Sequence, residues 1–163
     1  MHTEEQADVV SKRPLERTFG NDTAMFVRVR RRKLKGGHYR WRTGDRITAS
    51  ASYDVVHAVR IDGKPRHKFL FGLGSLKEGN SDHEMVLFWD HAISKMKRNK
   101  LDEERRRRLM DEMIRKGVPA PLADALDTDY WRNRCSWLPG THEMLDELKR
   151  YIASKDAAGE ASA

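Results

Sequence analysis

The stretch that decides the fold is residues 47–73, ITASASYDVVHAVRIDGKPRHKFLFGL. From Ile47 to Ile61 the apolar side chains fall mainly on odd-numbered positions, among them Tyr53, Val55 and Val59. This alternation is typical of a β-strand with one buried face. The run is long for one strand, so we expect a bend or bulge near Ser52–Asp54. Asp62-Gly63-Lys64-Pro65 then predicts a turn, because these residue types favour tight turns.

Further strands are expected on both sides of this stretch. His67, Phe69, Phe71 and Leu73 alternate with Arg66, Lys68 and Leu70. Upstream, Met25, Val27 and Val29 alternate with Phe26, Arg28, Arg30 and Arg32. Gly36-Gly37 is a hairpin signal, and after it His38, Arg40 and Arg42 alternate with Tyr39 and Trp41. The pattern predicts three to four antiparallel strands.

After Ser81 the apolar spacing changes to about 3.6 residues, the period of an α-helix. Ser81 and Glu84 have the spacing of a capping box. The first helix has one apolar stripe: Met85, Phe88, Trp89, Ala92, Ile93 and Met96. A second helix is expected over Asp102–Lys116, ended by Gly117. A short helix over Leu122–Tyr130, an irregular loop over Trp131–Gly140 and a last helix from Thr141 complete the prediction.

Strands first and helices after predict the α+β class, with an N-terminal antiparallel sheet and three to four helices packed on one face. Residues 25–152 are expected to form one domain, with a basic β-sheet part over 25–79 and a helical part over 81–152. Residues 1–24 are expected to be a flexible arm, and residues 153–163 a tail that frays.

The positive charge is concentrated in the sheet part. The whole chain carries a formal net charge of +7, and residues 25–80 hold 14 Lys/Arg against 4 Asp/Glu, a net +10. Such asymmetry indicates a polyanionic partner. The single cysteine, Cys135, cannot form an internal disulfide or by itself a cysteine zinc site, and no apolar run approaches the roughly 20 residues of a membrane helix. We therefore expect a cytoplasmic protein that does not enter a membrane.

A basic hairpin is the predicted binding site. Arg28, Arg30 and Arg32 project to one side of a strand, and a turn at Gly36-Gly37 would place Arg40 and Arg42 opposite them. Facing like charges are destabilising unless an anion such as phosphate neutralises them. The predicted nucleic-acid-binding residues are Arg28, Arg30, Arg32, Lys33, Lys35, Arg40, Arg42 and Lys68. The alternative for the arginines is a solvated edge that prevents sheet aggregation.

The remaining charged and reactive residues indicate no catalysis. In Arg105–Arg108 the arginines follow Asp102, Glu103 and Glu104, so i,i+4 pairs (Asp102 with Arg106, for example) predict a self-neutralised helix surface. The histidines show no metal-binding spacing, and Cys135 has no identifiable base partner. We expect no enzyme activity, no catalytic residue, no metal and no cofactor.

Phe26-Val27-Arg28-Val29, the segment from Ile61-Asp62-Gly63-Lys64-Pro65-Arg66, and Leu73-Gly74-Ser75-Leu76 together resemble the N-terminal β-module of DDE-type insertion-sequence transposases. The resemblance spans residues 26–76 and implies a DNA-associated module. An extra segment around Arg42–Tyr53 departs from the pattern. No room remains for a catalytic domain with three separated carboxylates, so transposase activity is not implied.

Two functions follow from these patterns. The first is a non-catalytic accessory protein of bacterial or mobile-element type that binds nucleic acid, DNA rather than RNA. The alternative is a protein-interaction module, an adaptor or homo-oligomer without a nucleic-acid role. Its interface would combine the loop containing Trp131 and Trp137 with the helix over Met144–Ile152, because tryptophans in loops often anchor interfaces.

Overall fold

The computed structural model describes residues 25–40, 43–137 and 140–162; the predicted arm over residues 1–24 and Arg42 lie outside these ranges. Three strands come first and helices follow, which confirms the α+β class. The strands are β1 (Met25–Lys33), β2 (Ala49–Ile61) and β3 (Lys64–Lys77). The helices are α3 (Asp82–Arg98), α4 (Glu103–Arg115), α5 (Ala123–Leu126), α6 (Asp129–Trp137) and α7 (Thr141–Ser162).

The sheet is antiparallel with the order β1-β2-β3. The predicted turn between β2 and β3 is confirmed, and Ile61 pairs with Lys64 across it. Asp62 and Gly63 both have positive φ, 52° and 74°, as a type I′ turn requires. This turn matches the right-handed twist of the two strands, so β2 and β3 form a continuous ribbon.

The hairpin predicted at Gly36-Gly37 is wrong. β1 pairs with β2 instead, with Arg28 opposite Asp54. The two glycines do turn the chain, but they turn it into a loop that closes on itself: Ile47 N donates to His38 O at 2.8 Å. The apolar positions explain the choice, because pairing Val27 with Val55 places both side chains in the core.

The irregularity expected near Ser52–Asp54 is confirmed at this position, but the extra residues lie in β3, which pairs with β2 there. β2 pairs with β1 without interruption. Against β3 the register shifts between Tyr53 and Asp54 and again between Val55 and Val56. The additional residues are Leu73 and Leu70 of β3, so β3 carries two bulges. Bulges bend a strand and increase its local twist.

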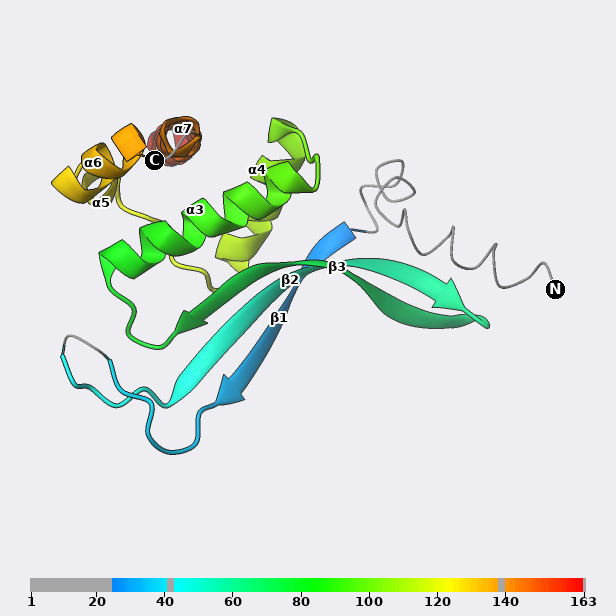
Figure 1. The fold of residues 1–163 in the computed structure, drawn as a ribbon. Helices are drawn as coiled ribbons and strands as arrows, with labels where there is room; N and C mark the ends of the chain where they lie inside the picture. Colours follow the sequence, from blue (N-terminus) through cyan, green and yellow to red (C-terminus); the bar gives the residue numbers. More distant parts are fainter. Residues whose placement is uncertain (1–24, 41–42, 138–139, 163) are drawn as a thin grey trace.

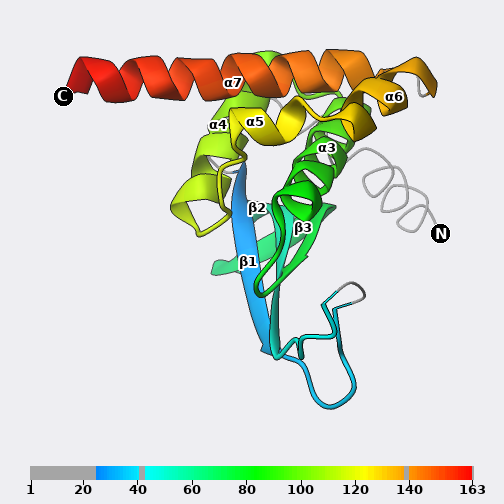
Figure 2. The same ribbon diagram turned by 90° about the vertical axis from the view of Figure 1, so that its left-hand side faces the viewer.

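The described helices, α3 to α7, all lie on one side of the sheet (Figure 1). α3 covers the sheet directly, and α7 crosses over α3 and α4 as the layer farthest from the strands (Figure 2). The apolar stripe predicted for α3 is buried as a whole: Met85, Phe88, Trp89, Ala92, Ile93 and Met96. It packs mainly on β3 and shares one core with Leu73 of that strand, Val27 of β1 and Val55 of β2. Burial of this face holds the two layers together.

Local signals define the ends of α3 and α4 as predicted. Ser81 Oγ accepts a hydrogen bond from Glu84 N at 3.2 Å, and Asp102 Oδ1 accepts one from Arg105 N at 2.9 Å. Gly117 follows α4 with φ +103°, and Val118 N donates to Met113 O at 3.0 Å. This is a Schellman motif, for which a glycine in left-handed conformation is favoured.

Two predictions for the C-terminal part are wrong. The expected irregular loop over Trp131–Gly140 is largely the helix α6, and Trp131 is 1% exposed within the core. The segment expected to fray continues α7 as far as Ser162. Its alanine, lysine and glutamate residues favour helix, which explains the extension. Within the described residues, no helix combines the length and apolar character needed to cross a membrane.

Candidate nucleic-acid interface

The predicted row of arginines on β1 exists. Arg28, Arg30 and Arg32 alternate with the buried Met25 and Val27, so they occupy the sheet face turned away from the helices. Their partners across the ladder are residues of β2, and Arg32 lies opposite Ser50, which in turn pairs with Lys77 of β3. Arg32 and Lys77 therefore flank a small side chain on the open face.

Asp54 neutralises part of this row. It is 5% exposed, and its Oδ2 lies 3.3 Å from Arg28 Nη2 and 2.8 Å from Arg30 Nη2. The facing partner of the arginines is thus a buried carboxylate rather than Arg40 and Arg42. Two guanidinium groups share one carboxylate, so this cluster retains one positive charge and Arg30 remains largely exposed.

Arg40 has a structural role, which corrects its assignment as a phosphate contact. Its side chain is 14% exposed and forms an ion pair with Glu84 at 2.6 Å. It also donates to the carbonyl oxygen of Glu78. Arg40 therefore anchors the β1–β2 loop to the start of α3. Arg42 lies outside the described residues.

Side chains of α4 block one edge of the sheet. Val27 N donates to Glu112 Oε1 at 2.8 Å, and Lys116 Nζ donates to Val27 O. Lys116 also lies 5.2 Å above the ring of Phe26 and 3.0 Å from Glu112. Both outward-facing backbone groups of Val27 are thereby satisfied, which protects this part of the edge strand from pairing with another chain.

A second exposed basic element is the end of the β2–β3 ribbon, residues 58–69, here called the basic ribbon. It projects beyond the helices (Figure 1). Its cations Arg60, Lys64, Arg66 and Lys68 are all exposed. Lys64, Arg66 and Lys68 pair with Ile61, Val59 and His57, and therefore share one face of the ribbon.

Sequence reasoning named Lys68 but missed the other three cations. The signal was present, because Asp62-Gly63 is a strong hairpin turn and basic residues flank it on both sides. Ile61 and Phe69 of the same element are 55% and 53% exposed. Burial and the charge of Lys68 both lower the pKa of His57, which precedes the basic ribbon.

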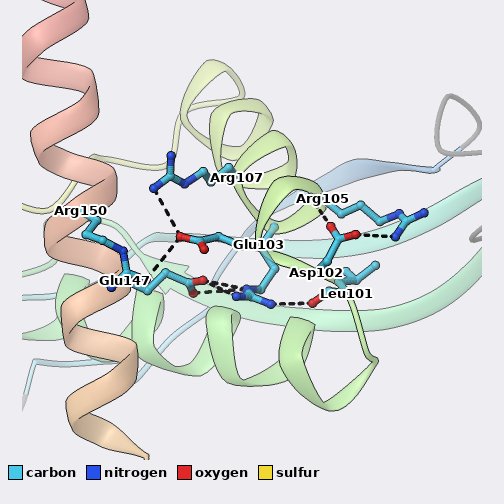
Figure 3. Close-up of polar contacts among 8 residues, drawn as sticks. Leu101, Asp102, Glu103, Arg105, Arg107, Glu147 and Arg150 are labelled. Carbon is cyan, nitrogen blue, oxygen red and sulfur yellow. Dashed lines mark hydrogen bonds and ion pairs between the residues drawn. The ribbon is translucent and has the colours of Figure 1, made fainter.

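Lysines and arginines of the sheet differ from those of the helical layer in whether they form ion pairs with acids. Among the described residues, these exposed sheet-part cations take part in no ion pair: Arg32, Lys33, Lys35, Arg46, Arg60, Lys64, Arg66, Lys68 and Lys77. In the helical layer, acids pair with Arg105 and Arg107 of α4 (Figure 3), and a further acid pairs with Arg106. Among the described residues, exposed lysines and arginines without an ion pair are thus concentrated on the sheet.

Of the predicted i,i+4 pairs, Glu103 with Arg107 is confirmed, whereas Arg105 and Arg106 have other partners. Asp102 caps α4 and pairs with Arg105 at 2.8 Å, while Glu103 accepts from Arg107 and Arg150 (Figure 3). Arg106 does not reach Asp102; it turns inward to Glu147 of α7. An i,i+4 rule cannot predict this pair, because its acid lies on another helix.

Two cavities lie outside the exposed basic surface. One of about 260 Å³ lies between the sheet and Pro119, with Arg31 and Tyr53 in its lining. Arg31 Nη2 already donates a hydrogen bond to Lys116 O at 3.3 Å, so this side chain links β1 to the end of α4. The other, of about 590 Å³, lies between α3 and the start of α7 and includes Asp90 and Arg134. No group of three or more potential metal ligands occurs among the described residues.

Trp131, one part of the predicted protein interface, lies in the core instead. Its ring lies 5.1 Å from that of Tyr130 and 5.9 Å from that of His83. A buried tryptophan cannot anchor a partner protein at the surface. The side chain of Trp137 lies outside the described residues.

Comparison with models of protein families, with curated proteins and with solved structures found no match to this chain.

Proposed function

We propose that this protein binds nucleic acid without catalysing a reaction, and that the exposed cations of the sheet contact the phosphates. DNA is the expected ligand. The single observation that carries the proposal is the separation of charge between the layers: exposed, unpaired lysines and arginines gather on the sheet. Arginine and lysine at such sites bind phosphate oxygens and release the counterions around a nucleic acid.

The proposal assigns different roles to the residues predicted as phosphate contacts. Arg32, Lys33, Lys35 and Lys68 are exposed and free to contact phosphates. Arg30 is exposed but oriented by Asp54. Arg28 has a side chain only 29% exposed in the same cluster, so it orients the cluster more than it reaches a ligand.

The test is fluorescence anisotropy of labelled duplex DNA, single-stranded DNA and RNA, each titrated with the full chain at several salt concentrations. We expect binding whose affinity falls steeply as salt rises, because each phosphate contact contributes about −0.9 to the slope of log K against log salt. The variant Arg32→Gln/Lys33→Gln/Lys35→Gln should bind more weakly and with a shallower slope. Absence of binding to all three ligands at low salt would refute the proposal.

A further inference from the structure

We infer that the basic ribbon, residues 58–69, enters the major groove of duplex DNA and presents the face carrying Lys64, Arg66 and Lys68 to the groove. The inference rests on the proposed function and specifies the ligand and the element that recognises it. The predicted site centred on β1; the structure offers a second element that projects from the body.

The dimensions of the basic ribbon match the groove. Residues 57–61 of β2 pair with residues 64–68 of β3. Five residues at a rise of about 3.3 Å span about 17 Å, and the two strands lie about 4.8 Å apart. The major groove of B-DNA is about 12 Å wide and 8.5 Å deep, and it admits a two-stranded ribbon. The paired end of the ribbon is therefore narrow enough to enter this groove.

The chemistry of the ribbon face also fits. Lys64, Arg66 and Lys68 occupy alternate positions of one strand, so their side chains emerge about 6.6 Å apart. The outer two can reach the phosphate chains that border the groove, while a guanidinium between them can bind guanine O6 and N7 with two hydrogen bonds. Ile61 shares this face near the turn and is 55% exposed, a placement that suits contact with a thymine methyl group.

The fold holds the ribbon in a defined shape before any ligand binds. The turn at Asp62 and Gly63 is closed in the conformation that the strand twist prefers. At the base of the ribbon the ring of His67 packs edge-on against that of Phe26, with 4.9 Å between centroids. An ordered ribbon loses little conformational freedom on binding, which favours affinity.

The experiment compares two triple variants that remove the same charge. The test variant is Lys64→Gln/Arg66→Gln/Lys68→Gln. The control variant, Arg98→Gln/Arg115→Gln/Lys149→Gln, removes three exposed cations of the helical layer that take part in no ion pair among the described residues. Circular dichroism and thermal unfolding verify that both fold. With a labelled duplex of about 20 base pairs, we expect the test variant to bind at least about tenfold more weakly and its salt slope to be shallower by about 2 to 3, while the control stays close to the parent chain.

A measurement on the unaltered chain locates the groove. Its affinity is compared between plain duplex and duplex whose cytosines carry glucosylated 5-hydroxymethyl groups, which fill the major groove and leave the phosphates accessible. Binding weakened at least tenfold by the glucose supports the inference. Equal binding to both duplexes, tenfold preference for single strands, or equal losses in the two triple variants would overturn it and leave the proposed function intact. Failure to bind any nucleic acid would overturn both.

Discussion

The ion pair between Arg106 and Glu147 should contribute strongly to stability, and replacing Glu147 with alanine tests this. The Arg106 side chain is 13% exposed and that of Glu147 2%. Arg106 Nε lies 3.0 Å and 3.3 Å from the two carboxylate oxygens, and its Nη2 donates to Oε1 as well. The substitution leaves the guanidinium in a region with little water, where only the carbonyl of Leu101, 2.6 Å from Nη1, still accepts a hydrogen bond.

The expected loss follows from this burial. Removing one partner of a buried ion pair lowers the free energy of unfolding by about 3–5 kcal/mol. The remaining bond to Leu101 favours the lower end, so we expect about 3 kcal/mol. With a urea dependence of about 2 kcal/mol per molar, the midpoint of urea unfolding should fall by about 1.5 M.

The assay is urea unfolding followed by circular dichroism, with Asp129→Ala as the matched control. That substitution breaks the ion pair of Asp129 with Arg132, whose side chains are 91% and 63% exposed. An exposed pair contributes about 0–1 kcal/mol, so the control should lose little. A second variant, Arg106→Met/Glu147→Leu, removes both charges and should recover most of the stability lost by Glu147→Ala. Equal, small losses for Glu147→Ala and Asp129→Ala would refute the assignment of this pair as a buried link between α4 and α7.

Three further outcomes are expected. Burial raises the pKa of Asp90, with Arg134 and His91 opposing the shift, so its ionisation disfavours the fold. The contribution of Asp90 to the free energy of unfolding is fully present below the pKa of the unfolded chain and is lost as pH rises through the pKa of the folded protein. Asp90→Asn should therefore stabilise the protein at neutral pH. It should also reduce the change in the urea midpoint between about pH 4 and pH 7. Trp131→Ala should lower the free energy of unfolding by about 3–5 kcal/mol in thermal unfolding, because it empties a core position. Asp54→Asn should free Arg28 and Arg30, raising duplex affinity severalfold in anisotropy while lowering the melting temperature; unchanged affinity would show that the Asp54 cluster lies away from the ligand.

Local signals predicted most of the fold. Ser81 and Gly117 act through hydrogen bonds between residues a few positions apart, so spacing alone predicted them as helix ends. Asp62-Gly63 predicted its hairpin for the same reason. Gly36-Gly37 misled because glycine shows where a chain can turn and not which segment it pairs with afterwards. The pairing of β1 with β2 depends instead on the joint burial of Val27 and Val55, which lie far apart in the sequence.

The candidate site was less predictable. The common face of Arg28, Arg30 and Arg32 follows from alternation, whereas their neutralisation by Asp54 follows from a register that no local pattern specifies. Arg40 is removed from the site by Glu84, which lies in a different element. The exposure of Arg66 could not be foreseen either, because it depends on where the helical layer stops covering the ribbon.

The two bulges of β3 have a consequence for insertions and deletions. Leu73 and Leu70 divide β3 into three registers. Core-facing residues such as Leu76 pair in the first register, near Ala51, and residues 64–69 pair in the last register, which the turn sets. Each extra residue absorbs a mismatch of one position between them. The basic ribbon can therefore change in length independently of the core strands. Adding one residue pair to it would extend its reach by about 3.3 Å and leave the alternation of the core strands unchanged.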